Sequence, residues 1–496
     1  SGSGGGGSSG IGNCPIVPLG HKNGCYFFIS ASSELRSIKA EALEAGRGVR
    51  ALFSGVSREA EAWCHANFPT TNNEWSHKDA GHWIIKSCNA AGVFDASTAD
   101  LRSIGMWRDQ DNNAVAHCGN LLVYPDGLVL PLSRIRAKQI MIGAAPIAPP
   151  ANIPVDCHLM FELLRNLRNS WGWKRKHDAD IFFGWVAAAY LGGFPNWRAH
   201  LYVHGSRGSG KSRLMELAAS LLGDLAGDVV NDATEAGLRQ SRNNQARPVL
   251  IDEFEPDENA RNGARQDSML GLFRRMSGGH GGRTSRGGAD HSSVSFRLLG
   301  PAYVSSINHI HLEPQDRSRF VMLELGRIPD VENPVQHAAL LQALEKQASE
   351  VFPAVFKRML AQSDRWDLTH ARITAEARYQ GADARQADTV ATILSGRDLA
   401  LFDEDICEAR VVDLKPILLE MIGDASEADE TSEGVEALEY LLSSVLLLDH
   451  GVRRSVGELL KSVITDTLLV GVDDASGALG RVGVHVLQNK DCVAVR

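Results

Sequence analysis

The chain has 496 residues, of which 51 are basic and 60 acidic, so its formal net charge is −9. At roughly 150 residues per domain this length suggests about three domains, and a hydrophobic content of 44% excludes wholesale disorder. The net charge excludes a uniformly basic coat for wrapping duplex DNA, but it does not exclude a local basic patch. No apolar run reaches the ~18 residues that span a bilayer, so no membrane association is expected. Cysteines without a CxxC pair or a secretion signal favour a cytoplasmic location.

The first 143 residues divide into a linker and a predicted small domain. Residues 1–10 contain only glycine and serine, a composition typical of an expression linker. Residues 11–143 are expected to form a small α+β domain. Hairpins are predicted at Asn23-Gly24 and around Pro125-Asp126-Gly127, and a helix is predicted after Ser33.

A proline-rich linker then leads to a predicted α/β region. Residues 144–154 contain four prolines and cannot propagate a helix. Two helices are expected over residues 156–192, the second of them buried, with Asp178 and Asp180 interpreted as surface-facing acids. From Arg198 to about Leu325, apolar strands alternate with helical patterns, which predicts a largely parallel sheet covered by helices.

Residues 205–212 read Gly-Ser-Arg-Gly-Ser-Gly-Lys-Ser and match G-x-x-x-x-G-K-[ST] between a predicted strand and a predicted helix. The glycines Gly205, Gly208 and Gly210 let backbone N–H groups curl around a phosphate at the helix N-terminus. Lys211 is then expected to reach the β- and γ-phosphates of ATP, and the Ser212 hydroxyl to bind Mg²⁺. The alternative is a chance glycine-rich turn.

The next predicted strand, residues 248–251, ends in Asp252 and Glu253. Beside a phosphate loop, Asp252 is expected to hold Mg²⁺ through water and Glu253 to polarise the attacking water. An aspartate followed by a glutamate favours a protein that hydrolyses ATP over one that holds a nucleotide as a switch. Two acids at the end of a strand can also serve only to cap a helix.

Residues 274–291 are rich in arginine and histidine and contain six glycines, so a conventional helix is not expected there. We expect a basic hairpin in which Arg283 and Arg286, with His291 close by, contact the phosphates of single-stranded DNA without reading sequence. Aromatic residues for base stacking are absent from this segment. The alternative is a solvated loop without function.

A third predicted strand, residues 302–307, ends at Asn308, which is expected to orient the attacking water; Asn308 can also be an ordinary turn residue. Arg317 and Arg319 follow, and an arginine supplied to the γ-phosphate of a neighbouring subunit stabilises the charge of the transition state. Arg319 is the preferred candidate of the two, and local pairing with carboxylates is the alternative.

The remaining chain is predicted to be mainly helical. Residues 331–400 are expected to form a helical, lid-like region, and residues 424–433 an acidic loop. Over residues 401–496 the order of helix, helix and two short strands suggests a winged-helix-like domain.

Taken together, these motifs resemble the helicase part of phage and prophage primase–helicase proteins, which are AAA+ ATPases related to superfamily 3 helicases. The resemblance implies an α/β fold with an AAA+ P-loop core over residues 155–330. It also implies a homo-hexameric ring that moves 3′ to 5′ on single-stranded or forked DNA, with a primase module or replication proteins as partners. The segments that carry the resemblance lie throughout the chain: residues 14–20, 105–109, 197–200, 233–240, 247–253, 305–308, 385–388 and 393–397.

The resemblance transfers ATP and Mg²⁺ as cofactors, and it transfers the roles given above to the phosphate loop, the acidic pair, Asn308 and the two arginines. No carboxylate triad for priming precedes residue 150, so priming activity is not expected. A non-unwinding AAA+ initiator, loader or defence-related ATPase remains the alternative function. A metabolic P-loop kinase is disfavoured by the two arginines and by the basic segment.

Overall fold

The computed structural model divides the chain into two compact units, Ser1–Ile422 and Gly423–Arg496. This division lies later in the chain than the boundary at residue 401 suggested by the sequence. Within these units the structure describes residues 14–53, 58–132, 139–231, 233–254, 260–279, 284–287, 293–306, 312–326, 334–430, 441–442, 444–448, 453–465, 472–486 and 493–495.

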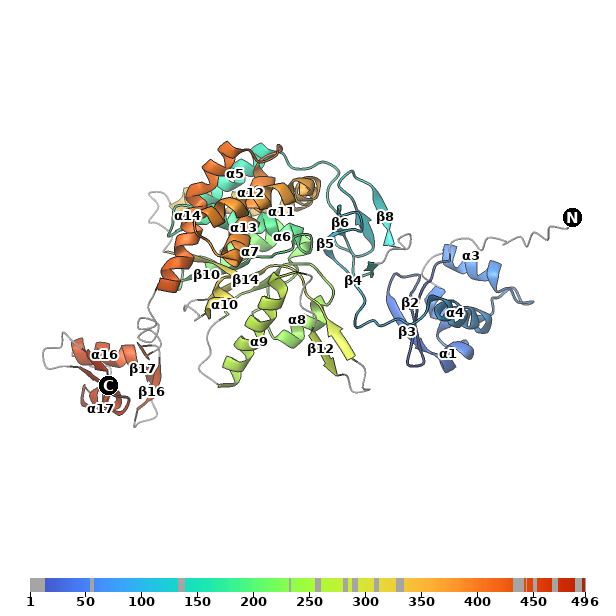
Figure 1. Cartoon of the computed structure of the whole chain (residues 1–496), viewed down its shortest axis with the longest axis horizontal. Coiled ribbons are helices and arrows are strands. Elements are labelled where there is room, and N and C mark those ends of the chain that lie inside the picture. The colour runs from blue at the N-terminus through green and yellow to red at the C-terminus, as the bar shows by residue number, and fades with distance from the viewer. Residues whose placement is uncertain are drawn as a thin grey trace. The chain divides into compact units, whose positions relative to one another are not determined.

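The first described segment forms a three-stranded antiparallel sheet with helices packed on it (Figure 1). Asn23 and Gly24 have φ angles of 51° and 74°, as the predicted hairpin requires. The helix predicted after Ser33 is present but begins later, at Ala40, because a strand comes first: Ser33 has a φ of 63° and lies in the turn before that strand. The elements are β1 (Val17–Lys22), β2 (Cys25–Ile29), β3 (Leu35–Lys39), α1 (Ala40–Glu44), α2 (Val49–Phe53), α3 (Arg58–Asn67) and α4 (His77–Ala91).

A second small sheet follows and packs against the central region. It confirms the hairpin predicted around Pro125-Asp126-Gly127. Trp107 is buried in it and shares a hydrophobic cluster with Ala246 and Leu299 from later in the chain. The strands are β5 (Gly105–Arg108), β6 (Ala114–His117), β7 (Leu121–Val123) and β8 (Val129–Pro131), with a separate pair of β4 (Leu101–Arg102) and β9 (Ile140–Met141).

The central sheet has four parallel strands in the order β11-β14-β10-β15, which confirms the predicted parallel sheet. Alternate residues of β10 enter different cores: Leu201 and Val203 belong to one hydrophobic cluster and Tyr202 to another, so both faces of the sheet are covered. Val230 extends the sheet by a parallel bridge to Ile251. The strands are β10 (His200–Gly205), β11 (Val249–Ile251), β14 (Ala302–Ser306) and β15 (Phe320–Leu325).

Helices cover the two faces unequally (Figure 1). The larger layer packs around α6, whose residues are all buried, as the sequence predicted. This layer contains α5 (Cys157–Arg168), α6 (Asp178–Leu191), α7 (Lys211–Leu222), α11 (Pro334–Ala361), α12 (Trp366–Tyr379) and α13 (Ala384–Leu401). The opposite face carries α9 (Ala260–Ser277), with α8 (Glu235–Arg242) beside it. No described helix is both long and apolar enough to cross a membrane.

Asp178 and Asp180 are not surface acids; both are 0% exposed. Asp180 accepts hydrogen bonds from Arg168 at 2.7 and 2.9 Å and from Arg397 at 2.9 Å. These contacts join α5, α6 and α13. The residue pattern of the sequence correctly placed both acids on a helix. It could not show that arginines far away in the sequence are their partners.

The end of the first unit and the second unit also differ in part from expectation. The helix α14 runs over Glu408–Glu430, so most of the expected acidic loop at 424–433 is helical. In the second unit the helices α16 (Val456–Thr465) and α17 (Val472–Arg481) precede a hairpin of β18 (Val484–Val486) and β19 (Val493–Val495). An earlier hairpin of β16 (Val445–Leu447) and β17 (Arg453–Ser455) precedes these helices. The expected order of helix, helix and two strands is therefore present.

His200 begins β10 and is fully buried where several elements meet. Its Nε2 lies 2.8 Å from the Phe273 carbonyl and 2.7 Å from the Ser277 hydroxyl, while Nδ1 accepts the Ala302 N–H at 2.9 Å. An accepting Nδ1 requires the neutral ring with its proton on Nε2. Burial accordingly lowers the pKa of His200 to about 4.

This histidine predicts a loss of stability in weak acid. In the unfolded chain His200 takes up a proton below its ordinary pKa of 6.5, whereas the folded chain resists protonation down to about pH 4. The unfolded state therefore binds more protons in this window, and the free energy of unfolding should fall by about 3 kcal/mol as the pH drops through it. Urea unfolding of wild type and His200→Gln at several pH values measures this. Parallel pH profiles for the two proteins would contradict the assignment.

Candidate functional site

The glycine-rich loop joins the end of β10 to the start of α7. Gly208 and Gly210 have φ angles of 83° and 86°, a left-handed conformation that favours glycine. A Cβ atom at Gly205 would lie 2.4 Å from the Leu325 carbonyl oxygen on the neighbouring strand. Each glycine of the predicted motif therefore has a steric reason to be there. The loop leads into the N-terminus of α7, a place where backbone N–H groups have no acceptor within the helix itself.

Lys211 lies inside this loop and is only 8% exposed. Its Nζ donates hydrogen bonds to the carbonyl oxygens of Gly205 at 2.7 Å and Ser206 at 3.2 Å. From outside, the indole N–H of Trp171 donates to the Gly210 carbonyl at 3.2 Å. The loop is therefore held in its curled shape by its own lysine and by a buried tryptophan.

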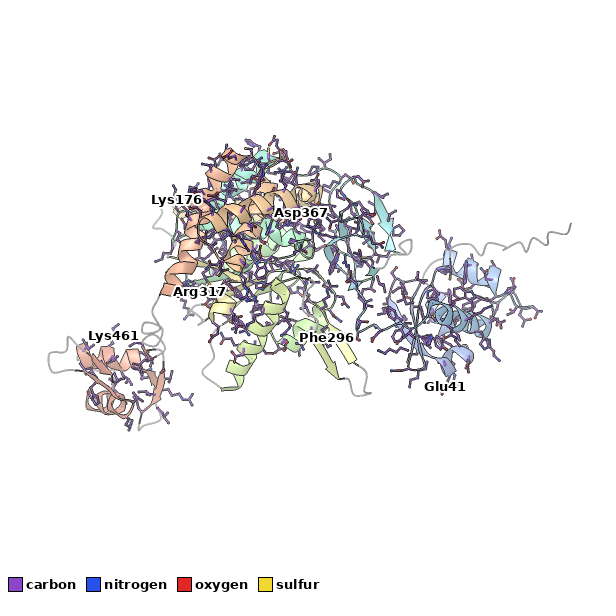
Figure 2. The ribbon with its side chains drawn as sticks, in the orientation of Figure 1. Glu41, Lys176, Phe296, Arg317, Asp367 and Lys461 are labelled. Atoms are coloured by element: carbon purple, nitrogen blue, oxygen red, sulfur yellow. The ribbon has the colours of Figure 1, made fainter. Side chains whose placement is uncertain are left out.

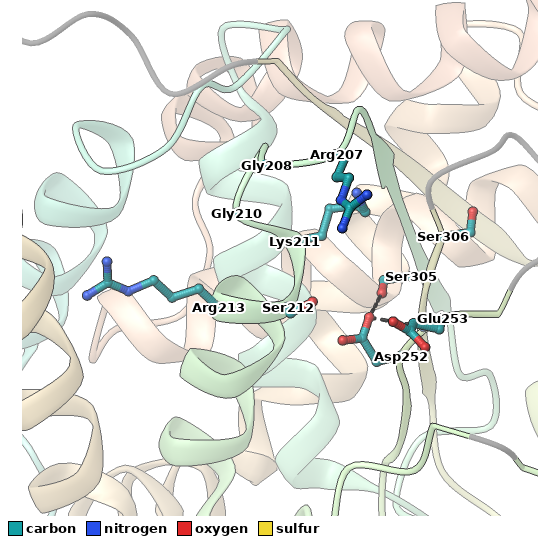
Figure 3. Close-up of a pocket in the computed structure, with 10 residues that line it drawn as sticks. All are labelled: Arg207, Gly208, Gly210, Lys211, Ser212, Arg213, Asp252, Glu253, Ser305 and Ser306. Carbon is teal, nitrogen blue, oxygen red and sulfur yellow. Dashed lines mark hydrogen bonds between the residues drawn. The ribbon is translucent and has the colours of Figure 1, made fainter.

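A cavity of about 300 Å³ opens beside the loop (Figure 3). It is lined by the glycine-rich loop, the first turn of α7 and the ends of β11 and β14: Arg207, Gly208, Gly210, Lys211, Ser212, Arg213, Asp252, Glu253, Ser305 and Ser306. Because β14 lies between β10 and β11, the acids that follow β11 stand two strand spacings, about 10 Å, from the loop strand. This separation leaves room for phosphate groups and water between the loop and the acids.

The two acids differ in their surroundings. Asp252 is fixed by hydrogen bonds from the Ser305 hydroxyl and from the backbone N–H of Glu253 (Figure 3). Glu253 is exposed and has a φ of 55°, the left-handed conformation that costs a non-glycine residue roughly 1–3 kcal/mol. The Phe254 N–H donates to the Ser305 carbonyl at 2.7 Å. The strained backbone conformation therefore occurs at Glu253, the residue that the sequence predicts to polarise the attacking water.

The lining residues fit a magnesium–triphosphate group. The exposed Ser212 hydroxyl and the Asp252 carboxylate supply the oxygen ligands that Mg²⁺ prefers, and such sites use few protein ligands. Among the described residues no group of three or more histidine, cysteine, aspartate or glutamate side chains gathers. The guanidinium of Arg213 is held by Glu345 at 2.5 Å and points away from the acids (Figure 3). Lys211 and Arg207 are the remaining cations of the lining.

Arg317 and Arg319 lie at the other end of the strands, where β10 and β15 begin. Arg317 ends α10 (Pro314–Arg317), and the Arg319 carbonyl accepts the N–H of His200 at 2.8 Å, at the start of β10. Since β10 runs from His200 to Gly205, these arginines are separated from the phosphate loop of the same chain by about 17 Å of strand. Neither arginine lines the cavity of its own chain.

The surroundings of Arg319 hold it in place. Its guanidinium carbon lies 5.8 Å from the centre of the Trp197 ring. Burial and the neighbouring Arg385 lower the pKa of Arg319. The Thr389 hydroxyl donates to the carbonyl of Ser318 at 2.9 Å, so α13 fixes the backbone between the two arginines.

The expected basic hairpin is present as an antiparallel pair, β12 (Thr284–Gly287) and β13 (Ser293–Phe296). Arg286 lies on β12, in register with Val294. The side chain of Arg286, together with Arg283, His291 and Asn308, lies outside the described residues.

The first part of the basic segment is not a loop, because α9 continues through Arg274 and Arg275 to Ser277. From 274 to 297 the sequence has five arginines and one aspartate. Three of these arginines are already paired with acids: Arg274 with Asp316, Arg275 with Glu235 and Arg297 with Asp100. The local positive charge available to a ligand is therefore smaller than the count of arginines indicates.

Sequence reasoning missed several residues of the site. Ser305 holds Asp252, Trp171 holds the loop, and Arg385 adds charge beside Arg319. The strand pattern of residues 302–306 could have placed Ser305 next to the acids. The contact of Trp171 depends on a segment outside any motif and leaves no local signal.

The strain at Glu253 predicts an unusual order of stability among variants. Glu253→Gly removes the side chain where a left-handed conformation costs glycine nothing, whereas Glu253→Ala keeps the strain. Glu253→Gly should therefore be more stable than Glu253→Ala by about 1 kcal/mol, although glycine usually lowers stability. Thermal unfolding of both variants measures this, and an alanine variant at least as stable as the glycine variant would show that the conformation is not strained.

The chain is similar to solved structures over most of its length. One, described as SCCmec type IV Cch, an active helicase, is 13% identical with a TM-score of 0.47, and the match covers 96% of this chain and 90% of that chain. Another, the A form apo structure of the NrS-1 C-terminal region, is 12% identical with a TM-score of 0.32, over 81% of this chain and 92% of that one. No protein-family model matches the sequence, and no curated protein matches it. Because both likenesses are distant, the function of the chain has to be argued from its own residues.

Proposed function

We propose that the chain is an ATP-hydrolysing DNA helicase or translocase with an AAA+ core that works as a ring of identical subunits. The observation that carries the proposal is the cavity that Lys211 and Ser212 share with Asp252 and Glu253, while the candidate arginines lie at the other edge of the sheet. The first arrangement supports binding and hydrolysis of a nucleoside triphosphate. The second supports a site that needs a neighbouring copy.

The residues divide the chemistry among them. The loop N–H groups and Lys211 would bind the β- and γ-phosphates, and Ser212 and Asp252 would hold Mg²⁺. Bound Mg²⁺ would neutralise charge on the phosphate oxygens. Glu253, exposed at the cavity, would orient a water and accept its proton, with Asn308 as a further polar group for that water. Ser305 keeps Asp252 in position by its hydrogen bond.

The arginines support assembly into a ring. About 17 Å of strand separates them from the phosphate loop of the same chain, so Arg317 or Arg319 would reach the γ-phosphate of the next subunit. A head-to-tail contact of this kind closes into a ring when its rotation permits. Six subunits, and movement 3′ to 5′, are what the sequence resemblance implies.

The hairpin β12–β13 supports contact with DNA. It lies between the acidic pair and the third strand of the sheet in the chain, and it carries Arg286, with Arg283 just before it and His291 between its strands. These cations would contact the phosphates of single-stranded DNA inside the ring. A primase module or other replication proteins would be the partners of such a ring.

A second function is favoured by the separate unit of residues 423–496. Its two helices followed by a hairpin suit a winged-helix DNA contact. In that case the chain would be an initiator, loader or defence-related ATPase that does not unwind DNA, and ATP would control assembly.

Removal of the loop lysine tests the first function directly. Lys211→Ala should lower ATP hydrolysis by two orders of magnitude or more (about 3 kcal/mol in the barrier) and abolish strand displacement on forked DNA. Arg283→Ala combined with Arg286→Ala should reduce stimulation of the ATPase by single-stranded DNA. Hydrolysis without strand displacement in the wild type would favour the non-unwinding alternative, and an active Lys211→Ala protein would refute the site.

Mixing inactive variants tests the arrangement between subunits. The Lys211→Ala protein keeps both arginines, and the Arg317→Ala or Arg319→Ala protein keeps its phosphate loop. If the arginine acts on a neighbouring subunit, some sites in the mixture combine an intact phosphate loop from one protein with an intact arginine from the other. ATPase activity should then exceed the sum of the separate proteins. The variant that complements Lys211→Ala identifies the acting arginine. If neither mixture exceeds that sum, the arginines do not complete a site on another subunit.

A further inference from the structure

The hairpin β12–β13 is entered from α9, and the end of that helix is tightly held. Arg198, 2% exposed, donates from its guanidinium to the carbonyls of Met276 and Gly279 at 2.6 Å and of Pro195 at 2.7 Å. The Arg198 N–H also donates to the carbonyl of Ser277 at 2.8 Å. The end of α9 is therefore fixed as far as Gly279, five residues before β12 begins at Thr284.

The same end of α9 is bonded to the segment that carries the candidate arginines, residues 314–319. Arg274 donates from Nε and Nη2 to the two carboxylate oxygens of Asp316, at 2.5 and 2.6 Å. The Asp316 side chain is 1% exposed, and its carbonyl accepts the Arg319 N–H at 2.9 Å. Asp316 is thus joined by covalent chain to Arg317 and by a hydrogen bond to Arg319.

The chain that leaves the hairpin is fastened elsewhere. Arg297, just after β13, pairs with Asp100, and its backbone N–H donates to the Asn243 side chain at 3.0 Å. Ala246 forms parallel bridges to both Gly105 and Leu299, so this side is continuous with the β5–β8 sheet. The entering side of the hairpin is therefore fastened through Arg198, and the leaving side through Arg297 and the bridges of Ala246. Both sides also meet in one hydrophobic cluster, because Leu298 lies in it together with Phe273 and Met276 of α9.

We propose that Arg274 and Asp316 are a positioning pair that couples the trans-acting arginines to the DNA-contacting hairpin. The inference rests on the proposed function. When residues 314–319 engage the phosphate of a neighbouring subunit, the pair passes the change to the C-terminal end of α9, from which the chain leads to the hairpin. DNA in the ring and ATP at the interface then influence each other through this contact.

The geometry suits transmission of movement. A two-point bond between a guanidinium and a carboxylate fixes both distance and orientation. Because Asp316 is buried, separation from Arg274 would leave an unpaired charge inside the protein, so the two segments move together. Figure 2 labels Arg317, next to Asp316, and Phe296 on β13, which mark the two structural elements that the pair would connect.

The test compares Arg274→Gln with the wild type in the full chain. The measured quantity is the ratio of ATPase rates with and without single-stranded oligothymidylate. Arg274→Gln should lower this ratio by about 3- to 30-fold, the range expected for loss of one coupling contact. Binding of oligothymidylate and of an ATP analogue should stay within about twofold, because the pair touches neither ligand. Arg165→Gln, which breaks an exposed pair with Glu162, is the matched control and should leave the ratio unchanged.

Two further variants distinguish coupling through the pair from a purely structural role. Arg274→Lys keeps the charge but not the two-point bond and should recover part of the ratio. Arg274→Gln combined with Asp316→Asn should be no worse than Arg274→Gln alone, since the contact is already lost. Thermal unfolding establishes that each protein is folded; if Arg274→Gln is not folded, Arg274→Lys alone decides, by a ratio below that of the wild type.

Two outcomes overturn the proposal in distinguishable ways. A wild-type ATPase that single-stranded DNA does not stimulate removes the proposed function and the coupling together. A stimulated wild type with an unchanged ratio in folded Arg274→Gln removes the coupling alone. A ratio that falls only in proportion to lost DNA binding also removes it, because the pair would then shape the binding surface.

Discussion

The carboxyl ends of neighbouring parallel strands lie side by side at one end of the sheet, and the rest of this structure depends on that constraint. Because β10, β11 and β14 run in the same direction, the phosphate loop, the acidic pair and Ser305 meet at one edge although they are far apart in sequence. The same direction of β15 puts Arg317 and Arg319 at the other edge. A single chain therefore carries the cavity at one end of the parallel strands and the two arginines at the other end, an arrangement that suits the proposed head-to-tail assembly.

The sheet also orders the hydrogen bonds that keep the site in shape. Asp252 is bonded to Ser305 on the next strand, and the Gly210 carbonyl accepts a bond from Trp171, which precedes the sheet. The strained backbone at Glu253 persists because its neighbours on both sides are fixed, with the Asp252 N–H bonded to Val230 and the Phe254 N–H bonded to Ser305. Stable strand ends here support a residue that would not adopt its conformation alone.

Much of the fold was accessible from the sequence where the signal is local. The turn at Asn23-Gly24, the buried α6, the parallel sheet and the phosphate loop follow from spacing and residue type over short stretches. The errors concern tertiary partners: Asp178 and Asp180 became buried because Arg175, Arg168 and Arg397 reach them, and no local pattern reports this. For the same reason the sequence did not predict that Arg274 and Arg275 belong to a helix and are paired with acids from elsewhere.

The hydrogen bonds of Lys211 have a consequence for turnover. Its ammonium already has two carbonyl acceptors inside the loop, so a phosphate group competes with these acceptors and does not meet an unsatisfied charge. The binding free energy that Lys211 contributes is then a difference between charge-assisted bonds to phosphate and bonds to neutral carbonyls. In the proposed ATPase, the lysine would return to partners that are in place when the product leaves, so no buried ammonium would be left unpaired. Release of the product would then not require the protein to expose an unpaired charge.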